Sequence, residues 1–406
     1  MKSGYLSQYF VGVAAKILSA VEADYSVSNQ HEFNGVGNLK KLFGNSKDKK
    51  RYNAKFLYLN DNDDDPVTDD GFLTWYDARA NHLTRSEHRL YFPTTAVSTC
   101  AEAGDLLVIA LQGNNTVLVI IAENGTTISN QIKWLFGLDV LSHPGFSIRE
   151  ELESEQDRIA FASMIILEQI GVEVRVKEET FLDGMLSRFG TNFPDTRTFS
   201  DYARSTIPDL NPFNDPDRTL MSWIEREEIL FRTLEKHLIA DRLLTGFNEV
   251  DDFMTFSLSV QNRRKSRVGY AFVNHIEELF NLYKIQYDRN KVTENKSKPD
   301  FIFPSIDLYH NNKFDKFLLT MLGVKSTCKD RWRQVLTEAD RIKNKHLITL
   351  EAAISENQTN EMAMRKLQLI VPDVLHQTYT REQQLWLINV REFIELLRSK
   401  QNEAGL

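Results

Sequence analysis

The stretch Lys298-Pro299-Asp300-Phe301-Ile302-Phe303 decides how this chain is interpreted. A polar loop ends in Pro-Asp, and three apolar residues then begin a buried strand, which would fix the Asp300 carboxylate at its start, facing a cleft. A second apolar run, Met321-Leu-Gly-Val-Lys325, ends in a lysine. Metal-dependent nucleases use carboxylates to hold a divalent ion and a nearby lysine to orient or activate the attacking water. The lysine also adds positive charge where the phosphate becomes more negative. The two runs therefore indicate a nuclease-like metal site.

The second carboxylate of such a site is not where it is usually found. The common pattern is Pro-Asp, a spacer, then Asp/Glu-x-Lys, but Gly323 stands two residues before Lys325. A rearranged pattern takes the acid from a following helix, and Glu338 follows Lys325 after twelve intervening residues. A further acid, Glu277, lies on a predicted helix over 269–283. On spacing alone the alternatives stay open, because Pro-Asp pairs are common turns and Glu338 would suit a solvated helix face.

Longer matches separate these alternatives. Five segments, in the same order, resemble the catalytic half of the EcoRII-like family of type II restriction endonucleases: Ser259–Gly269, Lys298–Ser305, Val324–Gln334, Leu336–Ile342 and His346–Leu350. The resemblance implies a restriction-endonuclease-like α/β domain with a mixed central sheet. It also implies magnesium-dependent cleavage of double-stranded DNA at a short site with outer C:G pairs, similar to CC(A/T)GG.

The same resemblance implies roles for particular residues. The catalytic set is Asp300, Lys325, Glu338 and Glu277, with magnesium held by Asp300 and Glu338. A base-reading Lys-Asp-Arg corresponds to Lys329, Asp330 and Arg331, because Arg and Lys donate to guanine and Asp accepts from cytosine N4. Contacts to phosphates or base edges from a helix start are implied for Asn262, Arg263, Arg264 and Arg267. Without the family, Lys329–Arg333 would be interpreted as a basic, solvated helix start.

The N-terminal half is predicted to be β-rich. Short β-branched or aromatic runs, separated by Asn, Asp and Gly, predict a small barrel or sandwich with strands at Tyr9–Ile17, Lys55–Leu59, Phe72–Tyr76, Asp105–Leu111 and Thr116–Ala122. A helix is expected over 148–171. The acidic segment Asp61–Asp70 is expected to be a loop.

A thinner resemblance to the same family covers this half, through Tyr9–Val11, Leu18–Ala20, Trp75–Arg79 and Thr84–Arg89. It implies a DNA-binding pseudobarrel that clamps a second, effector copy of the DNA site, with functional positions His31, Arg79, Arg85, Glu87, His88 and Arg89. His88 stands where the family has a lysine, which predicts a weaker or pH-dependent phosphate contact. Alone, His31 would be interpreted as a loop histidine. Asp61–Asp70 and much of 90–175 do not align.

The chain is expected to form two domains, an effector domain over 1–174 and a catalytic domain over 178–406 that is preceded by a linker. Turn-forming residues over 190–217 suggest a linker or an irregular entry to the second domain. Beyond it, the pattern predicts helices at 217–245, 247–260, 266–284, 329–344 and 358–366, and strands at Phe301–Phe303, Leu319–Lys325, His346–Leu350 and Leu367–Val371.

Composition is consistent with this interpretation without demanding it. The 406 residues carry a net charge of −8, but basic clusters can be confined to one cleft. The two cysteines argue against a disulfide framework, and no apolar run is long enough to span a membrane. We therefore expect a cytoplasmic, prokaryotic, nucleoid-associated homodimer with a DNA methyltransferase as genetic partner. The alternatives are a modification-dependent nuclease that reads methylated cytosine, and a non-catalytic DNA-binding regulator.

Overall fold

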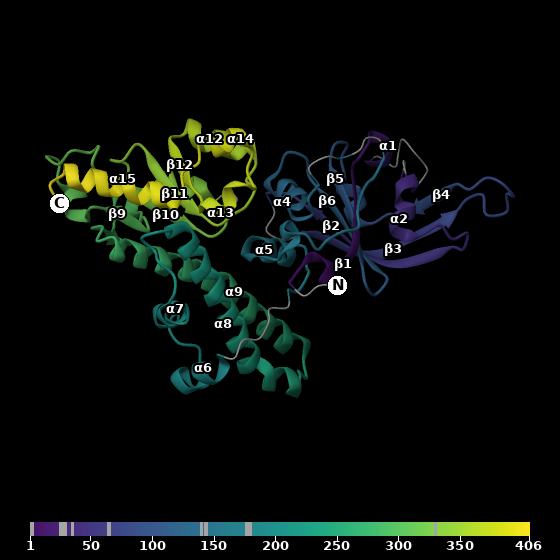
Figure 1. Ribbon diagram of the computed structural model, residues 1–406, viewed down its shortest axis with the longest axis horizontal. Helices are drawn as coiled ribbons and strands as arrows, with labels where there is room; N and C mark the ends of the chain where they lie inside the picture. Colours follow the sequence, from purple (N-terminus) through teal and green to yellow (C-terminus); the bar gives the residue numbers. More distant parts are fainter. Residues whose placement is uncertain are drawn as a thin grey trace. The chain divides into compact units, whose positions relative to one another are not determined.

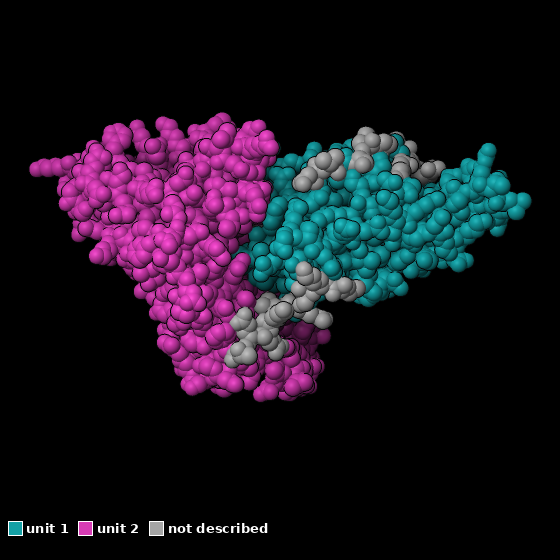
Figure 2. Space-filling view, in the orientation of Figure 1, with its two compact units in different colours: residues 1–174, 353–357 teal, residues 175–352, 358–406 magenta. Residues whose placement is uncertain are grey.

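The computed structural model describes residues 4–23, 31–33, 36–62, 66–138, 141, 145–174, 181–328 and 331–406. Contacts divide the chain into two compact units (Figure 2). Unit 1 comprises residues 1–174 and 353–357, and unit 2 comprises residues 175–352 and 358–406. Within the described ranges, no helix is long and apolar enough to cross a membrane.

Unit 1 is built on a seven-stranded sheet with the order β4-β3-β2-β6-β5-β1-β7. Its strands are β1 (Phe10–Ile17), β2 (Lys50–Leu59), β3 (Val67–Asp77), β4 (His88–Tyr91), β5 (Leu106–Gln112), β6 (Thr116–Ala122) and β7 (Ser147–Arg149). The β2–β6 pair is parallel and the other neighbouring pairs are antiparallel. The described helices are η1 (Leu6–Gln8), α1 (Ala20–Ala23), η2 (Val36–Leu39), α2 (Lys40–Phe43), α3 (Ala96–Cys100), α4 (Thr127–Leu135), η3 (Glu155–Asp157) and α5 (Phe161–Gln169).

The central strands of this sheet are buried on both faces, which is why β5 and β6 are continuous apolar runs. One face packs against α4 and α5, and the other forms a second core around Trp75 and Leu90. The short helix η2 contacts both β4 and β7, the two edge strands of the sheet. The β-rich architecture predicted for this half is confirmed, as a sheet whose open edges are both contacted by η2.

Unit 2 contains a five-stranded mixed sheet with the order β12-β11-β10-β9-β8, as predicted. Its strands are β8 (Asp288–Arg289), β9 (Phe301–Phe303), β10 (Thr320–Lys325), β11 (Lys345–Thr349) and β12 (Leu367–Ile370). The strands β10, β11 and β12 are parallel, whereas β8, β9 and β10 pair antiparallel. The helices are α6 (Leu182–Phe189), α7 (Thr196–Ser205), α8 (Pro216–Thr245), α9 (Val250–Leu282), η4 (Glu294–Lys296), α10 (Ile306–His310), α11 (Trp332–Val335), α12 (Glu356–Met364), α13 (Asp373–His376), α14 (Arg381–Gln384) and α15 (Val390–Glu403).

The two faces of this sheet have different partners. Phe301 and Phe303 project from one face toward α9 and α15, with the Phe280 ring centroid 5.2 Å from each and the Phe393 centroid 6.1 Å from Phe303. Figure 1 shows α15 running along the sheet. The opposite face receives Val335 of α11. We call this opposite face the site face, because Asp300 and Lys325 belong to it.

Several predicted elements in unit 1 need correction. The helix expected over 148–171 begins instead as strand β7, where Ile148 pairs with Ala14, and the rest of the span holds the short helix η3 and then α5. Part of the expected acidic loop is strand, because Asp69 and Asp70 continue β3 opposite β2. Pairing with a neighbouring strand has outweighed local sequence preference at both places.

Unit 2 also departs from prediction. The turn-rich segment 190–217 contains α7, capped by Asp195, whose carboxylate accepts from the Thr198 amide at 3.0 Å. The helices expected at 247–260 and 266–284 are one continuous helix, α9. The helix expected at 329–344 is reduced to α11, so Glu338 lies in the turn that follows it and not on the helix.

Candidate active site

The register of β9 and β10 brings Asp300 and Lys325 together. Phe301 pairs with Leu322, so Asp300 lies one residue before β9 and opposite the end of β10. The Val324 amide donates to Asp300 Oδ2 at 2.7 Å, and Lys325 Nζ lies 3.5 Å from the same oxygen. Both side chains are 24% exposed, so a substrate could reach them. The predicted pairing of Asp300 with Lys325 is present in the structure.

Gly323 leaves room for α11 on the site face. Gly323 and Lys325 are two residues apart on β10 and share the site face. A Cβ at Gly323 would lie 2.8 Å and 3.3 Å from the two methyl groups of Val335. The missing side chain therefore lets α11 pack directly on the strand. Glu338 follows three residues after Val335, and its amide donates to the Val335 carbonyl oxygen at 3.2 Å.

The charge of Glu338 is influenced by the other two groups. Burial raises the pKa of Glu338, the Lys325 ammonium opposes this, and the Asp300 carboxylate adds to it. Among the residues that the structure describes, none is a hydrogen-bond partner of the buried Glu338 Oε2 atom. A buried carboxylate oxygen with no donor is a fitting ligand for a divalent cation, which would satisfy it.

The carboxylates at this site supply part of the coordination shell that magnesium needs. In the described part of the chain, no three His, Cys, Asp or Glu side chains are gathered tightly enough to hold a metal by themselves. Magnesium is commonly bound by only one or two carboxylates, with water and substrate phosphate completing its shell. Asp300 and Glu338 fit that requirement.

The segment that carries Glu338 is held by a residue that the sequence analysis missed. Lys345, at the start of β11, is 7% exposed. Its Nζ donates to the carbonyl oxygen of Glu338, to Ala339 O at 3.0 Å and to Ile342 O at 3.1 Å. A lysine that opens an apolar strand was the available signal, because a buried ammonium requires acceptors.

A second set of contacts anchors the same segment. The Asp340 amide donates to Glu294 Oε2 at 3.2 Å, and the Arg341 amide donates to Tyr309 Oη at 3.2 Å. Tyr309 Oη in turn donates to Glu294 at 2.5 Å. We call residues 338–342 the Glu338 loop.

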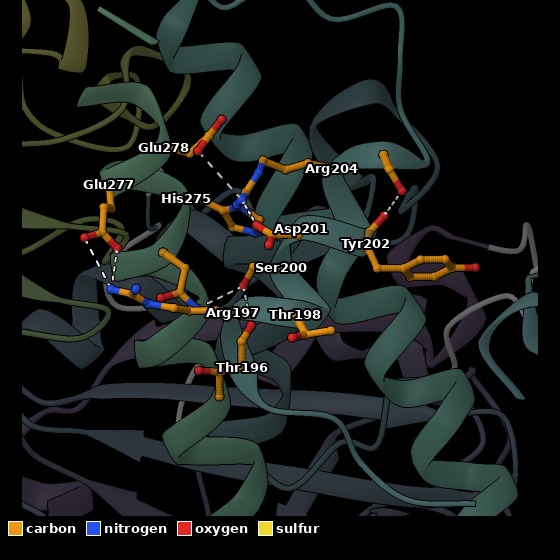
Figure 3. Close-up of polar contacts among 12 residues, drawn as sticks. Thr196, Arg197, Thr198, Ser200, Asp201, Tyr202, Arg204, His275, Glu277 and Glu278 are labelled. Carbon is orange, nitrogen blue, oxygen red and sulfur yellow. Dashed lines mark hydrogen bonds and ion pairs between the residues drawn. The ribbon is translucent and has the colours of Figure 1, made fainter. Parts of the chain in front are cut away.

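Glu277 lies in a different network (Figure 3). Its carboxylate pairs with Arg197 of α7 at 3.1 Å and with Arg289 of β8, and it accepts from Tyr287 Oη at 3.2 Å. The contacts described for Glu277 involve these groups and not Asp300, Lys325 or Glu338. Its role as a fourth catalytic residue stays a prediction.

The predicted DNA contacts of unit 2 are only partly described. Lys329 and Asp330 lie outside the described residues. Arg331 is exposed just before α11, six residues beyond Lys325 and thus near the same end of the sheet. Asn262 is exposed in the middle of α9 rather than at a helix start. The guanidinium of Arg263 lies over the Phe193 ring at 4.6 Å.

Two arginines of α9 are engaged inside unit 2. Arg264 Nε donates to Glu235 of α8 at 2.7 Å. Arg267 is 6% exposed, lies 4.4 Å from the Phe199 ring centroid, and its Nε is 3.8 Å from Glu227. Its burial argues against the predicted DNA contact, because phosphates reach only exposed groups; Arg267 instead joins α7, α8 and α9.

In unit 1, the predicted effector residues gather on β4 and the loop before it. Glu87 bridges two arginines, with Arg79 Nε at 2.6 Å and Arg89 NH2 at 2.9 Å. Arg89 also pairs with Glu32 at 3.0 Å. Asp77 Oδ1 accepts from the Arg79 amide at 2.9 Å and the Glu87 amide at 2.8 Å. The hydrogen bonds from the Glu87 and Arg79 amides lower the pKa of Asp77 to about 2. The same two bonds close the segment 78–87, which we call the arginine loop.

The position of His88 differs from the one predicted for a phosphate contact. Its side chain is 5% exposed, stacks on Trp75 with a 4.9 Å centroid separation, and contacts Ser46 O at 3.1 Å. Successive strand residues face opposite sides, so His88 points inward where Arg89 points outward. It is not placed to meet a phosphate. Arg85 is exposed, and the His31 ring packs edge-on against Phe92 at 6.0 Å.

The segment that carries the site is similar to known proteins. Residues 231–394 match the family "EcoRII C terminal". The type II restriction enzyme EcoRII of Escherichia coli is 40% identical over 181 residues, which are 44% of this chain and 45% of that enzyme. The chain therefore aligns with about half the length of this curated relative. The matched range contains Asp300, Lys325 and Glu338, and the predicted effector residues precede it.

Solved structures with a similar course of the chain have low identity. Metal-depleted Ecl18kI in complex with uncleaved, modified DNA has a TM-score of 0.46 at 17% identity and covers 57% of this chain and 87% of its own. A complex of the restriction endonuclease PspGI with substrate DNA has a TM-score of 0.44 at 18% identity and covers 52% and 94%. The sequence matches confirm the EcoRII resemblance of the C-terminal half: residues 231–394 match the EcoRII C-terminal family, and 181 residues of the chain are similar to EcoRII.

Proposed function

We propose that this chain is a magnesium-dependent endonuclease of a restriction–modification system, which hydrolyses double-stranded DNA at a short site with outer C:G pairs. The observation that carries the proposal is the meeting of Asp300, Lys325 and Glu338 on the site face, inside the segment that matches the EcoRII C-terminal family.

The chemistry assigned to these residues follows from their positions. Asp300 and Glu338 would hold magnesium, which when bound supplies a positive charge that polarises the scissile phosphate. Lys325 Nζ, 3.5 Å from Asp300 Oδ2, would orient the attacking water and offset negative charge on the phosphate. Water adds to phosphorus, the P–O bond to one sugar breaks, and the released sugar oxygen takes a proton.

Sequence recognition is assigned to Lys329, Asp330 and Arg331. Arginine and lysine can donate to O6 and N7 of guanine, and aspartate can accept from N4 of cytosine, so the three suit outer C:G pairs. Arg331 supports this by its exposure and by its place just beyond the strand that carries Lys325. A palindromic site is cut on both strands by two-fold-related subunits, so we propose a homodimer.

Unit 1 is proposed to bind a second copy of the DNA site and to activate cleavage. Arg79, Arg85 and Arg89 would contact phosphates, with His31 and Glu87 beside them. The effector duplex would act as a population shift, because it must bind the active form better than the inactive one. We expect the protein in the cytoplasm of a prokaryotic cell that also makes a methyltransferase for the same site.

The test is a cleavage assay with the intact chain. A plasmid library is digested with and without magnesium, the ends are sequenced, and the assay is repeated on cytosine-methylated DNA. We expect magnesium-dependent cuts in both strands at one short sequence with outer C:G pairs, blocked or weakened by methylation. Cleavage of methylated DNA alone would support the modification-dependent alternative. Folded protein that binds the DNA but cuts neither substrate would overturn the proposal in favour of a non-catalytic regulator.

A further inference from the structure

Lys345 is a buried cation with a complete set of acceptors and no carboxylate among them. Its three ammonium donors meet the carbonyl oxygens of Glu338, Ala339 and Ile342. A lysine ammonium has three donors, so the described contacts match its capacity. Carbonyl acceptors fix a backbone, whereas a carboxylate partner would fix only a side chain. The contacts therefore act on the course of the Glu338 loop.

The backbone of this loop needs such an anchor. Ala339 has a φ of 51°, a left-handed conformation that is uncommon for a residue with a Cβ. Helix α11 ends at Val335, so no regular structure holds Glu338 in place. The anchor comes from β11, whose parallel pairing with β10 sets its position relative to Lys325.

The geometry of the sheet shows why Lys345 can link the position of Glu338 to that of Lys325. Lys345 and Leu347 share a face of β11, and Leu347 lies against Gly323, with a Cβ built there 3.6 Å from its Cδ1. Lys345 is therefore on the site face, with Asp300 and Lys325. Glu338 carries one of the carbonyls that Lys345 binds, and Lys345 and Lys325 both act on the charge of its side chain.

We propose that Lys345 is a positioning residue, which holds the Glu338 carboxylate at the metal site by fixing the backbone of the Glu338 loop. The proposal rests on the assignment of Glu338 as a metal ligand. Lys345 touches neither substrate nor metal and acts only through Glu338. Loss of its three contacts should weaken metal binding far more than DNA binding.

The test compares Lys345→Met with Lys343→Met. Lys343 is an exposed lysine two residues away, so its replacement removes the same charge without touching the carbonyls. Metal affinity is measured without turnover, by calorimetric titration of Ca²⁺ into the complex with specific duplex, and cleavage is measured against magnesium concentration. We expect the Lys345→Met protein to need about ten times more metal, equivalent to about 1.4 kcal/mol, and Lys343→Met to behave as the unmodified chain does.

Two further measurements separate positioning from a general structural effect. Hydrogen exchange should accelerate at the amides of Asp340, Arg341 and Ile342 in Lys345→Met while β10 and β11 stay protected. In a Glu338→Gln background, Lys345→Met should cause no further loss of metal affinity. If the methionine variant does not fold, Lys345→Gln, which keeps two donors, takes its place with a smaller expected loss.

The outcomes are distinguishable from a failure of the proposed function. Unchanged metal affinity and unchanged loop exchange in Lys345→Met would overturn the positioning role. Equal and additive losses in the Glu338→Gln background would do the same, because Lys345 would then act on the whole unit. If the unmodified chain bound no divalent metal, the nuclease proposal would fail first, and the exchange data alone would report on the loop.

Discussion

The Glu338 loop in unit 2 and the arginine loop in unit 1 are each held by one charged side chain that binds backbone groups of the loop, a cation in unit 2 and an anion in unit 1. In unit 2 the Lys345 ammonium binds three carbonyl oxygens, and in unit 1 the Asp77 carboxylate binds two amides. The groups that the loops display differ. The Glu338 loop presents one half-buried carboxylate to a sheet face, whereas the arginine loop and the strand after it present arginines at the surface, already paired with Glu87 and Glu32.

This difference indicates what each region is suited to do. The Glu338 carboxylate is partly buried, and among the described residues one of its oxygens has no hydrogen-bond partner. Such a group is held in one place and is stabilised by a nearby positive charge. Exposed ion pairs are worth about 0–1 kcal/mol each, so the arginines can exchange their carboxylates for phosphates at small cost. Unit 2 is therefore suited to chemistry and unit 1 to adjustable, salt-sensitive binding.

The largest effect should come from Asp300 and Lys325, the pair proposed to be catalytic. Asp300→Asn and Lys325→Met should each lower the rate of DNA cleavage by about 1,000-fold or more, because a metal ligand or the charge facing the phosphate is lost. Specific DNA binding, measured in calcium, should stay close to that of the unmodified chain. Cleavage within a few-fold of normal by either variant would remove the contrast between the two regions.

A second prediction concerns how burial in unit 2 limits stability in acid. His346 is buried against Phe393, and burial lowers its pKa to about 3 from the ordinary 6.5. The unfolded chain therefore binds a proton below pH 6.5 that the folded chain refuses. Stability should fall as pH drops from about 6.5 toward 3, by up to about 1.4 kcal/mol per pH unit.

Urea unfolding at pH 7 and pH 5 checks this. His346→Leu should flatten the dependence on pH, whereas replacement of the exposed His310 by Gln should leave it unchanged. The same slope in all three proteins would mean that other groups, and not this buried histidine, set the acid sensitivity of unit 2.

Base recognition should be intermediate in size. Arg331→Ala should cost about 1–3 kcal/mol in binding to the specific duplex and act mainly at one C:G pair. Competition binding with duplexes altered one base pair at a time measures this. An equal loss on specific and random DNA would make Arg331 a phosphate contact, and unit 2 would then resemble unit 1 in how it binds.

The smallest effects should be found on the surface of unit 1. Arg85→Ala together with Arg89→Ala should lower the salt dependence of effector binding by about two units of slope, about one for each phosphate contact, and should abolish stimulation of cleavage by added specific duplex. Basal cleavage should not change. As a control, His88→Asn should leave the slope unchanged, because this side chain faces the core. If His88→Asn changed the slope, His88 would have to contact the effector DNA, which contradicts its inward position.

The sequence predicted those parts of unit 2 that depend on local pattern. The strands Phe301–Phe303 and Thr320–Lys325 are short buried runs, and their pairing brings Asp300 to Lys325. The spacing from Lys325 to Glu338 pointed to the second acid, although the connecting helix was overestimated. The short helix could not be foreseen, because it depends on Val335 packing over Gly323 across the sheet.

The roles of Lys345, Arg267 and His88 needed the folded chain. Each is a polar residue whose surroundings depend on how the chain folds back on itself: three carbonyls of the preceding loop for Lys345, the α7–α8 pair for Arg267, and Trp75 for His88. A basic residue in a charged run suggests solvent or DNA, and only packing shows that Arg267 is enclosed.

The most direct test of the displaced carboxylate is single-turnover cleavage of a duplex by Glu338→Gln, beside Asp340→Asn from the same loop and Glu277→Gln from α9. The account predicts that Glu338→Gln binds the duplex but does not cut it at any magnesium concentration, while Asp340→Asn cuts normally. Normal cleavage by Glu338→Gln, together with an inactive Glu277→Gln, would contradict it and would place the second acid on α9.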